Sequence, residues 1–179
     1  MWRTFRFDWM ISESARMTTR AEARYRIDAP NSQPRAVKVI ALDAASEEVI
    51  KRLARLPWNR ASFLTASAFA CMPARGGPFS MTGWLSDLAG RTTDLIDEVA
   101  SADLVVMIAT AGESAQAGSL IGEACVARAV MTTGLVLGTA AASEEALSKT
   151  LGQLRPYSVM LVAGGDEDYI ENMLVALRA

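Results

Sequence analysis

The sequence predicts one α/β domain, in which helices cover both faces of a mostly parallel, five-stranded sheet. Two observations carry this prediction: short apolar runs alternate with amphipathic segments, and turn or capping signals separate the two. Strands that are apolar throughout are buried on both faces, as in parallel sheets. Right-handed crossovers then give a doubly wound, Rossmann-like three-layer sandwich. The 179 residues suffice for one such domain with a sizeable core.

Five apolar runs rich in β-branched residues are expected to form the strands: 36–43, 61–67, 103–110, 133–139 and 158–164. Amphipathic helices are expected at about 46–56, 91–101, 117–130, 144–154 and 167–178. Ser46 and Ser143 fit the N-cap position of their helices, and Asp166 or Glu167 is expected to open the last one. Pro57 is expected to stop the first helix.

Two segments stand outside this alternation. Residues 1–35 are rich in Arg and polar residues and close with a turn signal, so they are expected to form an N-terminal arm before the domain at 36–179. Residues 71–83 form a Gly/Pro loop long enough to be a lid over the strand ends. Arg75 in this loop, or Arg91 after it, could offer a positive charge to an anion there; two exposed arginines are the simpler interpretation.

The composition excludes several chemistries. The chain has no histidine, which excludes Ser–His and Cys–His nucleophile pairs and the usual zinc sites. Cys71 and Cys125 lie in apolar surroundings typical of buried, inert thiols, although the count allows one disulfide. No clustered carboxylates suggest a metal. These absences favour a protein that is not an enzyme, and they identify no cofactor.

Charge and hydropathy indicate a cytoplasmic protein that self-associates. The N-terminal half is basic and the C-terminal half acidic, but acids are interleaved with the basic residues and no nucleic-acid-binding motif accompanies them. Hydrophobic residues make up 51% of the chain, which suggests apolar surface buried in a homo-oligomer, most simply a dimer. The longest apolar run, 104–109, is too short for a membrane span, and the start lacks the apolar region of a secretory signal.

Ligands of such sheets bind at the carboxyl ends of the strands, and two acidic positions are candidates there. Asp43 follows the first strand where a dinucleotide-binding protein would have G-x-G-x-x-G, which argues against NAD or FAD. Asp43 is expected to cap a helix or to contact a ligand hydroxyl. Asp166, after the last strand, has the same two interpretations, with a Mg²⁺ contact as a further alternative.

The loop "TAGESAQAGS" after the third strand is the stronger candidate. It offers Gly112 and Gly118 for backbone freedom, and its hydroxyl donors are Thr110, Ser114 and Ser119. It leads into a helix N-terminus, whose free N–H groups favour anions. Glu113 would repel a phosphate unless it points away or binds a sugar hydroxyl. Small residues here could also serve only the packing of the helix on the sheet.

Two families resemble this region. "ADLVVMIATAG…IGEACVARAVMTTGLVLG" resembles the tubulin/FtsZ GTPase segment that holds the glycine-rich phosphate loop, and the likeness of architecture extends over about 36–168. That loop is G-G-G-T-G-[TS]-G, of which Gly112 and Gly118 remain, so the resemblance implies a relative without GTPase activity. "IATAGESAQ" is similar to the sugar-isomerase (SIS) motif, in which hydroxyls grip a sugar phosphate; Thr110, Gly112, Glu113 and Ser114 match it.

Together these observations predict a non-catalytic protein that binds a small phosphorylated or polyhydroxyl ligand, such as a nucleotide, at 110–119. Asp43 or Asp166 would contact its sugar. Two alternatives stay open: a sugar-phosphate isomerase-type enzyme with Glu113 as its base, and a structural protein that acts through self-association.

Overall fold

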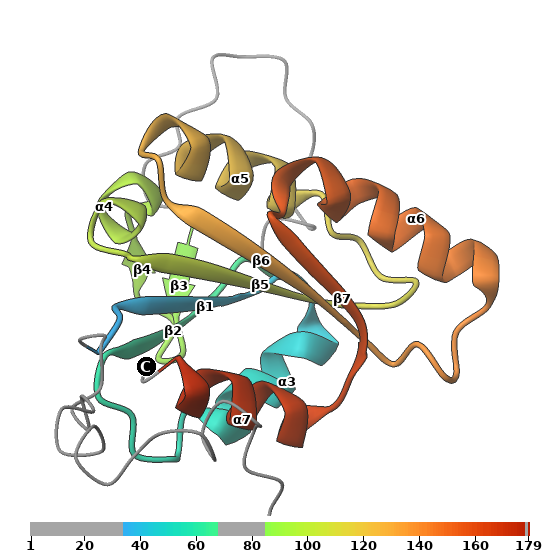
Figure 1. Ribbon diagram of the computed structural model, residues 1–179, viewed down its shortest axis with the longest axis horizontal. Helices are drawn as coiled ribbons and strands as arrows, with labels where there is room; N and C mark the ends of the chain where they lie inside the picture. Colours follow the sequence, from blue (N-terminus) through green and yellow to red (C-terminus); the bar gives the residue numbers. More distant parts are fainter. Residues whose placement is uncertain (1–33, 68–84, 178) are drawn as a thin grey trace, which may run out of the picture. The chain divides into compact units, whose positions relative to one another are not determined.

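The computed structural model describes residues 34–67, 85–177 and 179, which form a mixed α/β sheet domain (Figure 1). Its strands are β1 (Val37–Ala41), β2 (Ala61–Thr65), β3 (Leu85–Asp87), β4 (Thr92–Thr93), β5 (Leu104–Thr110), β6 (Met131–Leu137) and β7 (Met160–Gly165). Its helices are α3 (Ala44–Leu53), α4 (Leu95–Ala100), α5 (Ala117–Ala127), α6 (Glu144–Leu154), the 3₁₀ turn η2 (Arg155–Tyr157) and α7 (Glu167–Ala176).

The strands form one sheet in the order β4-β3-β2-β1-β5-β6-β7. The strands β2, β1, β5, β6 and β7 are parallel to one another. The strands β3 and β4 extend the sheet beyond β2 with antiparallel pairing. The predicted fold class, a doubly wound and mostly parallel Rossmann-like sandwich, is confirmed. The predicted strand number is wrong by two, because β3 and β4 were not expected.

The short β3–β4 hairpin replaces the start of the helix expected at 91. The Asp87 carboxylate accepts the backbone N–H groups of Ala89 (2.9 Å) and Arg91 (2.8 Å), which closes the turn, and Gly90 takes a left-handed φ of 80°. The helix α4 begins only after Asp94, whose side chain accepts the N–H of Ile96 at 2.7 Å. Strands of two and three residues leave too little pattern to be predicted.

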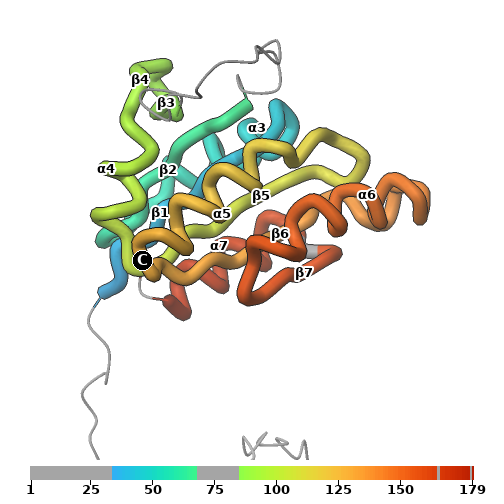
Figure 2. The backbone as a smooth tube through the Cα atoms, turned by 90° about the horizontal axis from the view of Figure 1, so that it is seen from above, coloured from blue at the N-terminus to red at the C-terminus, as the bar shows by residue number. Residues whose placement is uncertain are grey.

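Alternate residues of the central strands enter two separate cores. One core joins the sheet to α3 and α7, and the other joins it to α4, α5 and α6. The central strand β5 illustrates this: Val106 and Ile108 face the first core, whereas Val105 and Met107 face the second, and all are fully buried. This two-sided burial explains the unbroken apolar runs of the sequence. Figures 1 and 2 show α5 and α6 side by side over one face of the sheet.

Side-chain caps fix the start of most helices. Asp43 caps α3, and Ser46 returns the bond to the Asp43 backbone, so the prediction of Ser46 as the N-cap is wrong by three positions. The two residues form a reciprocal capping box: the Asp43 carboxylate accepts the Ser46 N–H, and the Ser46 hydroxyl accepts the Asp43 N–H. Asp43 can act as the N-cap because its backbone is extended, which lets its carboxylate reach the first turn of the helix. Ser143 and Asp166 cap α6 and α7 as predicted.

Close helix packing depends on a small residue in α5. A Cβ added to Gly122 would come within 2.8 Å of the Tyr157 ring in η2, which rests against this helix. Gly122 therefore lets α5 and η2 approach more closely than any larger residue allows.

Several predictions fall outside the described residues. These are the N-terminal arm except for residues 34 and 35, the loop 71–83, Cys71 and Arg75. None of the helices in the described part of the chain has both the length and the apolar content needed to cross a membrane.

Candidate functional site

The strand order reverses between β1 and β5, and this switch point lies at the predicted site. The chain leaves β1 into α3 on one face of the sheet and leaves β5 into α5 on the other. The two connections diverge there, and such a crevice is where doubly wound proteins bind ligands. Asp43 and Thr110, which are 67 residues apart in sequence, meet at this point.

Asp43 joins the two connections. Its Oδ2 accepts the backbone N–H of Thr110 at 2.8 Å, and its Oδ1 accepts the Thr110 hydroxyl at 3.0 Å and the Ser46 N–H at 2.8 Å. The residue is only 6% exposed. Both carboxylate oxygens and the Thr110 hydroxyl are thus occupied within the protein, so Asp43 caps a helix and ties β5 to α3.

The loop after β5 is held by two polar side chains of α6. The N–H of Gly112 donates to Thr150 Oγ1 (3.1 Å), and the N–H of Ala115 donates to Gln153 Oε1 (2.9 Å). Gly112 has a φ of 93°, a left-handed conformation that disfavours other residues. Thr150 and Gln153 were not predicted as site residues, although two polar residues on the inner side of a helix that packs on a core are an available signal.

Gly118 and Ser119, the next two predicted residues, have structural roles within α5. A Cβ on Gly118 would lie 2.8 Å from Leu154 and 3.5 Å from Leu42, so this glycine allows the helix to pack closely. The Ser119 hydroxyl donates to the carbonyl of Gln116 at 2.9 Å, within the first turn. Of the predicted residues in this region, Glu113, which is exposed, and Ser114, which is half-buried, have no side-chain hydrogen bond in the described structure.

The N-terminus of α5 differs from those of the other helices. Gln116 stands at its N-cap and makes no side-chain cap hydrogen bond, and the first turn contains no acidic residue. The helices α3, α4, α6 and α7 each have a side-chain cap and at least one acidic residue in the first turn. Among the described α-helices, α5 is thus the one whose N-terminal partial positive charge meets neither a side-chain cap nor an acidic residue. The N–H groups of Gly118 and Ser119 donate to the carbonyls of Ala115 and Gln116, so those of Gln116 and Ala117 are the ones left at this end.

Asp166 lies at the same edge of the sheet but two strands away from β5, which corresponds to about 10 Å. Its side chain accepts the Tyr169 N–H at 2.8 Å and caps α7. The neighbouring Glu167 pairs with Arg52 of α3 at 2.7 Å. The structure therefore brings Thr110 into contact with Asp43 and leaves Asp166 apart from both. Gly112, Glu113 and Ser114 follow Thr110 in the loop that α6 holds.

A second polar cluster lies at the end of β2. Glu47 Oε2 accepts the hydroxyls of Thr65 (2.8 Å) and Ser67, and Lys51 pairs with Glu47 Oε1 at 2.9 Å. Burial opposes ionisation of Glu47, but the hydrogen bonds from Ser67, Lys51 and Thr65 outweigh it and lower the pKa of the carboxyl. These groups satisfy one another and hold the end of β2 to α3.

The remaining titratable candidates are structural. Cys125 is fully buried, and burial raises the pKa of its thiol to about 12, in keeping with the predicted inert thiol. Arg91 is an exposed arginine that pairs with Asp87 at 2.7 Å within the β3–β4 hairpin. Within residues 34–67, 85–177 and 179, no group of three or more His, Cys, Asp or Glu side chains could hold a metal ion.

Comparisons with known proteins assign no family. No family model matches the chain, and no curated protein matches it. Among solved structures, the apo form of translation elongation factor SelB from Methanococcus maripaludis overlaps 78% of this chain at 13% identity, with a TM-score of 0.39. The overlap covers 36% of the SelB chain, so this chain spans just over a third of that factor's length. A TM-score this low identifies no relationship, and the fold assignment rests on the strand order itself.

Proposed function

We propose that this chain is a non-catalytic binding domain that takes the phosphate of a small polyhydroxyl ligand, such as a nucleotide or sugar phosphate, at the N-terminus of α5. The observation that carries the proposal is the uncapped, acid-free start of this helix at the carboxyl end of the central strand β5. N–H groups at such a position attract anions through hydrogen bonding and through the helix dipole.

The neighbouring loop supports a polyhydroxyl ligand. Thr150, Gln153 and Asp43 hold the backbone of the loop in place, so little ordering would accompany binding. The exposed Glu113 and the half-buried Ser114 keep their side chains available for sugar hydroxyls. The carboxylates of Asp43 and Asp166 are engaged in caps, so in this proposal the sugar contact predicted for them passes to Glu113.

The isomerase alternative is less well supported. A general base works best when it is partly buried and its pKa lies close to the working pH. Glu113 is exposed on the loop, and no second titratable side chain forms a hydrogen bond with it in the described structure. Turnover of a sugar phosphate that Glu113→Gln abolishes would restore this alternative.

Gln116→Glu provides the test, since it places a negative charge at the proposed phosphate position with almost no change in shape. The charge favours the helix dipole, so the variant without ligand should melt at the wild-type temperature or above it. The thermal shift produced by inorganic phosphate, ribose 5-phosphate, GTP or ATP should be lost. Asn172→Asp, an equal change at an exposed site of α7, is the control and should keep the shift. A wild-type protein that none of these compounds stabilises would refute the proposal.

A further inference from the structure

The strand β7 forms an open edge of the sheet. It pairs with β6 on one side, and the strand order ends there, so the outward N–H and C=O groups of its backbone have no strand partner in the described part of the chain. The segment from Val159 to Gly165 contains neither a charged residue nor a proline. Charged residues and prolines are common protections of edge strands, and β7 has neither. A register shift at Gly164, which has a φ of 97°, interrupts the pairing of β7 with β6 only near its carboxyl end, so the stretch from Met160 to Ala163 is suited to pairing with another strand.

Apolar side chains along this edge are exposed on both faces of the sheet. Val159, in the bend before the strand, is 80% exposed, and Met160, the first residue of β7, is 47% exposed. Successive side chains of a strand point to opposite faces, so Met160 and Leu161 lie on opposite faces of the sheet. Leu161, on the α6 side, lies over Gly134 of β6 and is itself half-buried. Pairing along β7 would therefore remove apolar surface from water above and below the sheet.

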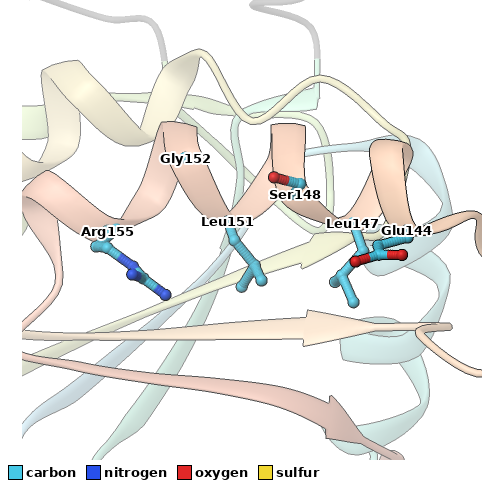
Figure 3. A pocket seen from close by; sticks show the side chains of 6 residues that line it. All are labelled: Glu144, Leu147, Ser148, Leu151, Gly152 and Arg155. Carbon is cyan, nitrogen blue, oxygen red and sulfur yellow. The ribbon is translucent and has the colours of Figure 1, made fainter.

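A groove of about 400 Å³ lies along one flank of α6, and every residue that lines it belongs to this helix or directly follows it. Two of these residues, Leu147 and Leu151, pack on the same core as Leu161 of β7. Its lining consists of Glu144, Leu147, Ser148, Leu151, Gly152 and Arg155. Figure 3 shows the side chains of Leu147, Leu151 and Arg155 projecting from α6 on the side of the strands, with Glu144 at the far end. Gly152 has open space where a Cβ would stand. Two leucines thus lie between an acid at one end and a base at the other.

We propose that β7 and this flank of α6 form a two-fold symmetric interface with a second copy of the chain. In this dimer β7 pairs antiparallel with β7 of the second copy. The charges of the groove favour a second copy over another partner, because a two-fold axis reverses the helix direction and brings each Glu144 next to Arg155 of the other copy. Neither residue has an ion-pair partner in the described part of its own chain. This inference is independent of the ligand site at α5.

Charge reversal tests the pairing directly, with the dimer dissociation constant of the full chain measured by sedimentation velocity over a concentration series. Glu144→Arg and Arg155→Glu, each alone, should raise the dissociation constant at least about tenfold, because each change places two like-charge pairs in the interface. The double variant restores both pairs with reversed polarity and should return the dissociation constant to within about threefold of wild type.

Two matched variants control for effects on the helix itself. Glu145→Arg makes the same charge change in the first turn of α6, and Lys149→Glu makes the opposite change further along. Neither residue lines the groove, so both variants should dimerise like wild type. Val159→Lys places a charge on the exposed edge without disturbing a buried residue and should also weaken the dimer at least about tenfold.

A covalent test fixes the orientation. The double variant Glu144→Cys/Arg155→Cys carries cysteines that the helix holds about 16 Å apart within one chain, beyond the reach of a disulfide. Oxidation should therefore give a disulfide-linked dimer. Three results would each overturn the proposal. The first is a wild-type protein that stays monomeric over the whole concentration series, and the second is an oligomer that Val159→Lys leaves unchanged. The third is a Glu144→Arg/Arg155→Glu double variant whose dissociation constant does not return toward the wild-type value.

Discussion

Replacement of Asp43 by Ala removes a helix cap and the tie between β5 and α3 at the same time. The Asp43 carboxylate caps α3 through the Ser46 N–H and also accepts two hydrogen bonds from Thr110. Loss of the cap costs about 1 kcal/mol of unfolding free energy. Loss of the hydrogen bonds from Thr110 to a charged acceptor costs about 2 kcal/mol more, so the total is about 3 kcal/mol.

Urea denaturation of the two matched cap variants measures the difference. Asp166→Ala removes the same kind of cap from α7 at an exposed position, where the carboxylate has no second role among the described contacts. It should cost about 1 kcal/mol, about 2 kcal/mol less than Asp43→Ala. Equal losses in the two variants would refute the assignment of Asp43 as the tie between β5 and α3. Thr110→Val combined with Asp43→Ala should add little to the single change, because both remove the same bonds.

Three further predictions concern the packing and the titrating groups. Gly122→Ala should destabilise the protein by about 2 kcal/mol because its Cβ meets Tyr157, whereas Gly152→Ala, with open space, should stabilise α6 by about 1 kcal/mol; urea denaturation checks both. Cys125 should react with a thiol reagent only at the rate of unfolding, since its pKa is about 12 and it is buried; denaturant should accelerate the reaction, and fast labelling of the native protein would contradict this. The lowered pKa of Glu47 stabilises the fold above the ordinary value of 4.5, and this stabilisation is lost as the pH falls through the lower folded value; thermal melts of Glu47→Gln should lose that part of the acid dependence.

Much of the fold could be predicted from local pattern. The helix α6 was predicted at the bounds it has, because Ser143 provides a cap and the apolar residues recur at helical spacing. The strand β5 was predicted within one residue, because an unbroken apolar run of this length between turn signals fits a doubly buried strand. The β3–β4 hairpin was missed because its strands are too short to show a period.

The position of the site in the fold could be predicted, but the hydrogen bonds among its residues could not. The sequence located the carboxyl ends of the strands as candidates, and it offered a cap or a ligand contact for Asp43. The hydrogen bonds of Asp43 with Thr110 and of Thr150 with Gly112 span 67 and 38 residues, and no local period encodes such distances. These contacts showed which candidates are engaged within the protein and which stay available.

The sequence by itself therefore determined the longer helices and strands, the layer architecture and the edge at which a ligand could bind, because burial pattern and capping chemistry act over one or two turns of chain. Only the tertiary structure decided that the start of α5, which has no side-chain cap, lies beside the switch point, and that β7 stands at the edge of the sheet without a strand partner among the described residues. Strand order is the physical reason. It is set by non-local pairing between segments that lie far apart in the chain, so the local sequence pattern cannot show which strands become neighbours and which one is left at the edge.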